Sequence, residues 1–151
     1  MVHLLYRLLK KSGKIKKVCG FEPQKFIYKI LEKNINSNKL DNVKIFYYVL
    51  GKSNHNITIS DFDYSQLGCF GGIGFNKKYD NSFSAKKLNS MQKVQIKRID
   101  DILKLKKCNF VKIDVETMEL DVLKGGRTFV SNHRPVIWYE NHIGPRCKVN
   151  S

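Results

Sequence analysis

Apolar positions recur with two different periods along this chain of 151 residues. Runs of β-branched and aromatic residues predict strands over residues 15–21, 43–50, 94–96, 110–115 and 136–139. The run 110–115 is typical of a buried parallel strand. Apolar residues three or four positions apart predict helices over 2–11, 26–35, 99–103 and 118–123. Helices that alternate with strands in this way indicate an α/β domain with a mainly parallel sheet.

The remaining stretches are polar or rich in glycine. Residues 57–59 predict a short strand at an antiparallel edge, and residues 77–92 predict a polar loop. Glycines at 68, 71, 72 and 74 match neither phosphate-binding glycine motif, so we expect a surface loop or hairpin there. After the helix at 118–123, Gly125 and Gly126 predict a stop with a left-handed cap.

Polar groups follow two of the predicted strands. The strand at 110–115 ends in Asp114 and Glu116, and the strand at 136–139 leads into Glu140 and His142. Ligands in open α/β sheets bind outside the carboxyl ends of parallel strands, so these groups form a candidate site. The alternative is that Glu116 or Thr117 only caps the next helix.

Glu22 lies between the strand that ends at Phe21 and the helix that Pro23 introduces. In nucleotide-binding α/β folds, an acid at such a junction accepts hydrogen bonds from ribose hydroxyls. The alternative is an acid that faces the positive end of the helix dipole.

The composition of the chain bears on domain number and on nucleic-acid, metal and membrane binding. The length and the 42% hydrophobic content predict one domain over residues 1–151. The net charge is +15, which suggests nucleic acid, but the lysines are scattered and no confirming motif is present, so we expect them to solvate the surface. The four cysteines lack metal-ligand spacing, which indicates reduced thiols in the cytoplasm. No apolar run reaches the length of a membrane span.

Short motifs along nearly the whole chain, in the same order, resemble those of the FkbM-type methyltransferases. They read VCGFEP at 18–23, NKLDNV at 38–43, VLG at 49–51, DFDY at 61–64, RIDDI at 98–102, VKIDVE at 111–116, ME at 118–119, VLKGG at 122–126, PVI at 135–137 and EN at 140–141.

The resemblance implies a Rossmann-like domain that binds S-adenosylmethionine and methylates a hydroxyl oxygen of a sugar or small-molecule scaffold. By position, Glu22 would hold the ribose, Leu50 and Gly51 would lie by the adenine, and Asp114 would face the methionine end and the substrate. The cofactor-binding set that this implies is Phe21, Glu22, Pro23, Leu50, Gly51 and Asp114. A carboxylate or imidazole can accept the hydroxyl proton, and the candidates are Asp114, Glu116 and His142.

Two departures from the family pattern matter. The family has glycine where this chain has Thr117, and a β-branched residue is strained there if the turn requires a positive φ. We expect the family's first strand, its glycine-rich loop and the strands after His142 to be absent, which would leave open sheet edges that a partner chain or self-association fills. The alternatives are a non-catalytic remnant or split half that acts through a partner, and a basic nucleic-acid-binding protein.

Overall fold

The structure, a computed structural model, describes residues 16–66, 86–115 and 117–139. The chain divides into two compact units, residues 1–49 and residues 50–151, and the prediction of one domain stays a prediction. The predicted helix at 2–11, most of the glycine-rich stretch, Glu116, Glu140 and His142 lie outside the described residues. In the part that is described, no helix is long and apolar enough to cross a membrane.

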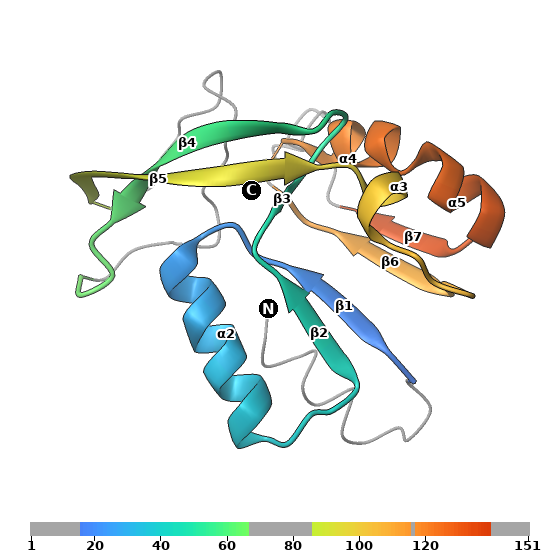
Figure 1. The fold of residues 1–151 in the computed structure, drawn as a ribbon, viewed down its shortest axis with the longest axis horizontal. Helices are drawn as coiled ribbons and strands as arrows, with labels where there is room; N and C mark the ends of the chain where they lie inside the picture. Colours follow the sequence, from blue (N-terminus) through green and yellow to red (C-terminus); the bar gives the residue numbers. More distant parts are fainter. Residues whose placement is uncertain (1–15, 67–85, 116, 140–151) are drawn as a thin grey trace, which may run out of the picture. The chain divides into compact units, whose positions relative to one another are not determined.

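The first unit contains a parallel pair of strands joined by a helix (Figure 1). Strand β1 (Val18–Phe21) pairs in register with β2 (Val43–Phe46), and α2 (Lys25–Ser37) connects them. Parallel neighbours need such a crossover because a tight turn can join only antiparallel strands. The rings of Phe21 and Phe46 stack at 5.1 Å between centroids, at the last position of the register. The first predicted strand and the helix after it are confirmed, and the second strand begins at Val43 as predicted.

The predicted continuous strand over 43–50 is wrong. Strand β2 ends at Phe46, and the aromatic run resumes as β3 (Val49–Leu50), which belongs to a different sheet. Between them, Tyr47 packs edge-to-face against Tyr28 of α2, with ring centroids 5.6 Å apart. A continuous run of aromatic residues therefore does not reveal this break, because the rings are half-buried both in β2 and in the two residues after it.

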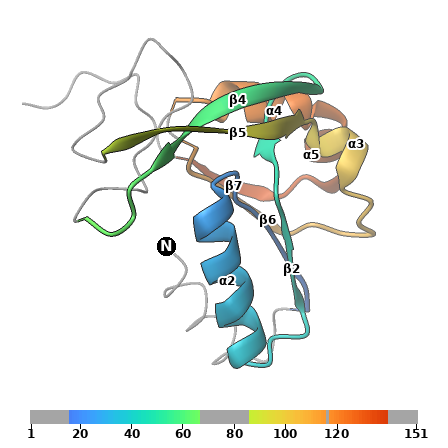
Figure 2. The same ribbon diagram turned by 60° about the vertical axis from the view of Figure 1, so that its left-hand side comes forward.

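Strands β4 (His55–Phe62) and β5 (Lys87–Lys97) form an antiparallel ribbon, which Figure 2 shows from the side. Strand β5 lies between β3 and β4 in the sheet. Ile59, Phe62, Val94 and Ile96 are the buried apolar residues of the ribbon. The antiparallel edge is confirmed, but the predicted loop is wrong for residues 87–92, which are strand. Their side chains are exposed or half-buried, so backbone pairing with β4, rather than burial, makes them a strand.

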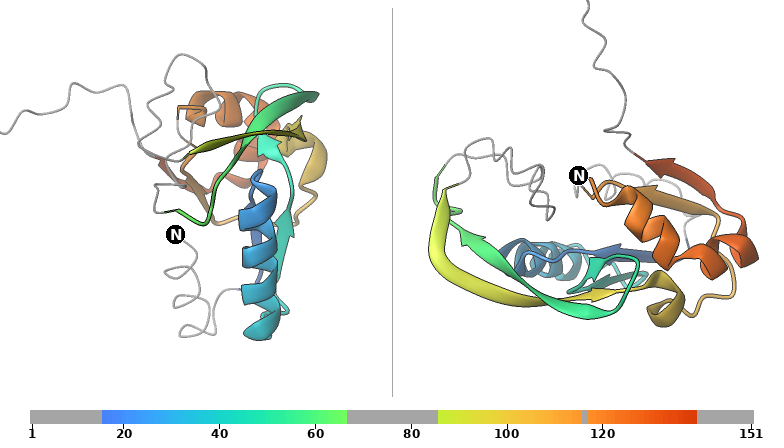
Figure 3. Two further views of the ribbon diagram at one scale, coloured as in Figure 1. Left: turned by 90° about the vertical axis from the view of Figure 1, so that its left-hand side faces the viewer. Right: turned by 90° about the horizontal axis from the view of Figure 1, so that it is seen from above.

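The rest of the second unit is a parallel pair covered by helices. Strands β6 (Phe110–Ile113) and β7 (Val136–Tyr139) pair in register, and Figure 3 shows α4 (Glu119–Gly125) and α5 (Arg127–His133) on one side of them. A short helix, α3 (Ile99–Ile102), precedes β6. The core between these elements consists of Ile99, Ile113, Val122 and Phe129.

Strand β6 is parallel as predicted but is buried on one face only. Phe110 is 59% exposed, and Val136, which pairs with it on β7, is 67% exposed. Side chains alternate between the two faces of a sheet, so the face opposite α4 and α5 carries these apolar groups into solvent.

Gly125 and Gly126 do not form a left-handed cap. Gly126 has φ −115°, and α5 begins at the next residue. A Cβ atom on Gly125 would lie 2.9 Å from the carbonyl carbon of Gly51, so this glycine permits two backbone segments to touch. The left-handed conformation instead ends α5, at Arg134 with φ 46°.

The α/β class is confirmed. Two of the sheets are parallel pairs, whereas the sequence suggested a single, mainly parallel sheet; the described residues form three separate sheets.

Candidate functional site

Asp114 follows the last residue of β6 and lies beside a cation and an indole ring. The ammonium of Lys112 is 2.9 Å from Asp114 Oδ2 and 4.8 Å from the centroid of the Trp138 ring. Lys112 and Trp138 occupy opposite positions in the register of β6 and β7. Two neighbouring parallel strands therefore place a carboxylate, an ammonium and an aromatic face together.

The loop after Asp114 is held by the first residue of α4. The backbone N–H of Val115 donates to Glu119 Oε1 at 3.4 Å, and Glu119 is only 9% exposed. The N-cap of α4 is Met118, and no side chain caps this helix. Thr117 is therefore not a cap, and that alternative is wrong for it.

Thr117 has φ 76°, so the expected conflict between a β-branched side chain and a positive φ is confirmed. Its Oγ1 is buried, and in the described residues it has no hydrogen-bond partner. Strain and an unpaired hydroxyl thus coincide three residues after Asp114, in a part of the fold where such costs often accompany function.

Glu22 follows β1 in the first unit. Its backbone N–H donates to the Phe46 carbonyl at 3.1 Å, and its Oε1 accepts the N–H of Gln24, the N-cap of α2, at 2.8 Å. Glu22 therefore binds the amino-terminal end of α2, which was the alternative role predicted for it. Burial raises the pKa of the carboxyl above its usual value, and the Gln24 N–H offsets part of this rise. The second oxygen of the carboxylate leaves room for a further donor such as a hydroxyl.

Gly51 is explained by close packing. Its N–H donates to the Lys97 carbonyl at 3.1 Å, and a Cβ atom there would lie 2.7 Å from Ile96 Cγ2. Leu50 packs against the core cluster of the second unit. Their assignment to the adenine stays a prediction.

The predicted residues are distributed over both units. Phe21, Glu22 and Pro23 lie in the first unit, whereas Leu50, Gly51 and Asp114 lie in the second. Glu116 and His142 lie outside the described residues. Among the residues that the structure describes, no three His, Cys, Asp or Glu side chains gather as metal ligands.

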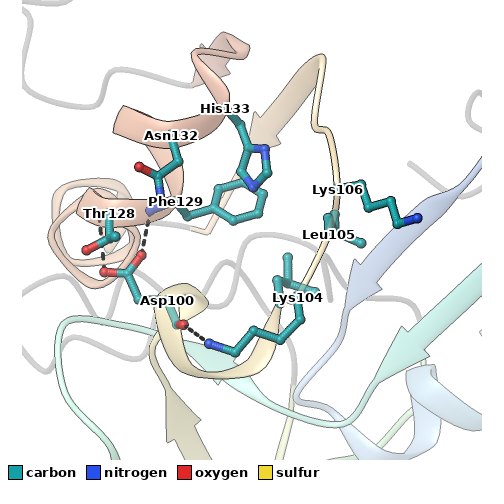
Figure 4. A pocket seen from close by; sticks show the side chains of 9 residues that line it. Asp100, Lys104, Leu105, Lys106, Thr128, Phe129, Asn132 and His133 are labelled. Carbon is teal, nitrogen blue, oxygen red and sulfur yellow. Dashed lines mark hydrogen bonds between the residues drawn. The ribbon is translucent and has the colours of Figure 1, made fainter.

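A hollow of about 380 Å³ lies elsewhere in the second unit, beside α5 (Figure 4). Its lining residues precede β6 and β7 in the chain, whereas Asp114 follows β6, so the hollow is near the opposite strand ends. Asp100 lies at its edge and accepts the backbone N–H groups of Phe129 at 2.7 Å and Thr128 at 3.2 Å. Burial raises the pKa of Asp100, but these hydrogen bonds and the charge of Arg98 lower it below its usual value. Asp100 therefore joins α3 to α5 and is a structural carboxylate.

Lys112, Glu119 and Trp138 surround Asp114, and the sequence pattern had not indicated them as neighbours of this carboxylate. Alternation along β6 puts Lys112 and Asp114 on one face, which the sequence could have shown. The position of Trp138 depends on the register between two strands, which the sequence pattern does not determine.

The chain is similar to known proteins in sequence and in fold. Residues 2–146 match the family described as "Methyltransferase FkbM domain". A solved structure, the methyltransferase FkbM from Methylobacillus flagellatus KT, is similar with a TM-score of 0.57 and 20% sequence identity. The similarity covers 91% of this chain and 29% of that chain, and at this identity it shows the fold alone. A search of curated proteins finds no significant match.

Proposed function

The chain belongs to the FkbM methyltransferase domain family, and from that membership we propose that it is an S-adenosylmethionine-dependent O-methyltransferase domain. The acceptor that we propose is a hydroxyl group of a sugar or small-molecule scaffold. The observation that carries the proposal is the family match over residues 2–146, together with carboxylates directly after β1 and β6.

The residues present fit a nucleoside cofactor with a cationic methionine end. Glu22 is half-buried and keeps acceptor capacity for ribose hydroxyls beyond its bond from Gln24. Asp114 already has an ammonium group at 2.9 Å, so its surroundings accept an organic cation. The proposal assigns Glu22 to the ribose and Asp114 to the methionine end of the cofactor.

S-adenosylmethionine, when bound, supplies an already activated methyl group. The protein then has to align the acceptor oxygen and exclude water, which together account for up to about 7–11 kcal/mol of barrier reduction. The acceptor hydroxyl also has to lose its proton. We assign that role to Asp114, with Glu116 and His142 as the other candidates, and such a base contributes about 10²- to 10⁴-fold.

Calorimetric titration of the intact chain with S-adenosylmethionine tests the proposal. We expect saturable 1:1 binding that Glu22→Ala weakens by about 10- to 150-fold, the equivalent of losing one charged hydrogen bond of roughly 1.5–3 kcal/mol. Glu32→Ala, an exposed acid on α2, is the control and should bind as the original chain does. No heat at millimolar ligand would contradict the proposal for this chain.

Asp114→Ala should abolish methyl transfer and leave folding largely intact. Asp121→Ala is the matched control, because Asp121 also forms a partly exposed ion pair, 3.5 Å from Lys52, in the same unit. Unchanged turnover in Asp114→Ala would remove Asp114 from the site.

A second proposal concerns a partner. Among the described residues, β1 pairs only with β2 and β6 pairs only with β7, so each of these strands has one edge without a neighbour. A strand from a second chain or a second copy could pair with such an edge. Cofactor binding that appears only with increasing protein concentration, in step with the mass measured by light scattering, would support this proposal, and binding by the monomer would contradict it.

A further inference from the structure

Three side chains at the carboxyl ends of β6 and β7 form a small, solvent-accessible arrangement on the sheet face opposite α4 and α5. Lys112 and Trp138 are register partners, and Asp114 lies two positions after Lys112 on the same face. The side chain of Asp114 is 18% exposed and Trp138 is 50% exposed, so solvent reaches both groups.

The ammonium of Lys112 makes an ion pair and a cation–π contact at the same time. It lies 2.9 Å from the carboxylate of Asp114 and over the indole face, 4.8 Å from the ring centroid. A carboxylate beside an aromatic face is the combination that binds alkylated cations, since the ring attracts the charge and also contacts the alkyl groups. The ammonium of Lys112 therefore marks a point where a carboxylate and an aromatic face both lie within contact distance of a cation.

We propose that Asp114 and Trp138 form a cradle for an organic cation, which the lysine ammonium occupies here and which a sulfonium or methylated ammonium ligand takes in its place. The exchange is feasible because Lys112 is held by a partly exposed ion pair on a flexible four-carbon stem, and such pairs contribute little to stability. Exposed Phe110 and Val136 continue the same face and provide apolar surface for alkyl groups.

This inference depends on the proposed function only for the identity of the natural ligand. S-adenosylmethionine carries both a sulfonium and an ammonium, and either could displace Lys112. The cradle itself can be tested with simpler cations, without methyl transfer.

Trp138 is the only tryptophan of the chain, so its fluorescence reports directly on the cradle. The experiment titrates choline chloride, and separately 3,3-dimethylbutan-1-ol, which has the same shape without the charge. Lys112→Met empties the cradle and keeps a side chain of similar length. We expect choline to change the fluorescence of this variant saturably, with a midpoint at least fivefold lower than in the original chain, and we expect the alcohol to have no such effect.

Two further variants complete the test. Lys124→Met removes one exposed lysine of α4 and should respond as the original chain does. Asp114→Asn, added to Lys112→Met, should raise the choline midpoint at least fivefold. If circular dichroism shows that Lys112→Met is unfolded, Lys112→Gln replaces it.

Equal midpoints with and without Lys112, or equal responses to choline and the alcohol, would overturn the inference. Binding of S-adenosylmethionine without any choline response would overturn the cradle and leave the proposed function standing. A choline response in a chain that binds no S-adenosylmethionine would support the cradle and contradict the proposed function.

Discussion

Replacing Thr117 by glycine should stabilise the second unit, which is unusual for the removal of a side chain. Thr117 combines φ 76° with a buried hydroxyl that has no hydrogen-bond partner in the described residues. Glycine adopts a positive φ without steric cost and has no hydroxyl to bury.

The size of the effect follows from four terms. A positive φ costs a side-chain-bearing residue about 1–2 kcal/mol, and a buried unpaired hydroxyl costs about 1–3 kcal/mol. Against this gain, glycine adds about 0.5–1 kcal/mol of chain entropy to the unfolded state, and the lost methyl group forfeits roughly 0.8 kcal/mol of burial. We therefore expect Thr117→Gly to raise the free energy of unfolding by about 1–3 kcal/mol.

Urea unfolding followed by Trp138 fluorescence measures this change, since Trp138 and Thr117 lie in the same unit. Two matched variants separate the terms. Thr117→Val keeps the branched side chain and removes only the hydroxyl, so it reports the cost of the unpaired group. Thr117→Ser keeps the hydroxyl and should gain less than glycine. A lower urea midpoint for Thr117→Gly than for the original chain would refute the reasoning.

Three further predictions concern packing and charge. Gly125→Ala forces a Cβ atom to within 2.9 Å of the Gly51 carbonyl carbon. Urea unfolding should show that this substitution lowers the free energy of unfolding by about 3 kcal/mol or more. A loss under about 1 kcal/mol would mean that the backbone at Gly51 moves away from residue 125 easily. Asp100→Asn should cost about 1.5–3 kcal/mol. Because folding lowers the pKa of Asp100, its contribution is present at neutral pH and is lost as the pH falls below about 4, so the variant and the original chain should converge there. Folding raises the pKa of Glu22, so ionisation of this carboxyl lowers the stability of the fold as the pH rises through the raised value. Glu22→Gln should therefore slow hydrogen exchange over residues 18–46 more at pH 7 than at pH 4. An equal effect at both pH values would contradict a raised pKa for Glu22.

The sequence predicted those parts of the fold that depend on local periodicity. The helix α2, the strands β1, β6 and β7 and the α/β class all follow from spacing that neighbouring residues determine. The break at Tyr47 and the extension of β5 to Lys87 depend on which distant segment packs against them, and a local pattern does not carry that information.

The candidate site shows the same division. Asp114 and the conflict at Thr117 could be predicted because strand ends and turn geometry are local features. The Trp138 face beside Lys112 could not, because it depends on the register of β6 against β7. Gly51 and Gly125 were assigned to a ligand and to a cap, respectively, but both positions lie in close contacts. A Cβ atom on Gly51 would meet Ile96, and one on Gly125 would meet the backbone of Gly51.

Titration of the ¹⁵N-labelled chain with S-adenosylmethionine tests the proposed cofactor binding most directly. We expect the amide resonances of Glu22 and of Asp114 to shift saturably as the ligand is added. No shift of either resonance at millimolar ligand would contradict the proposal.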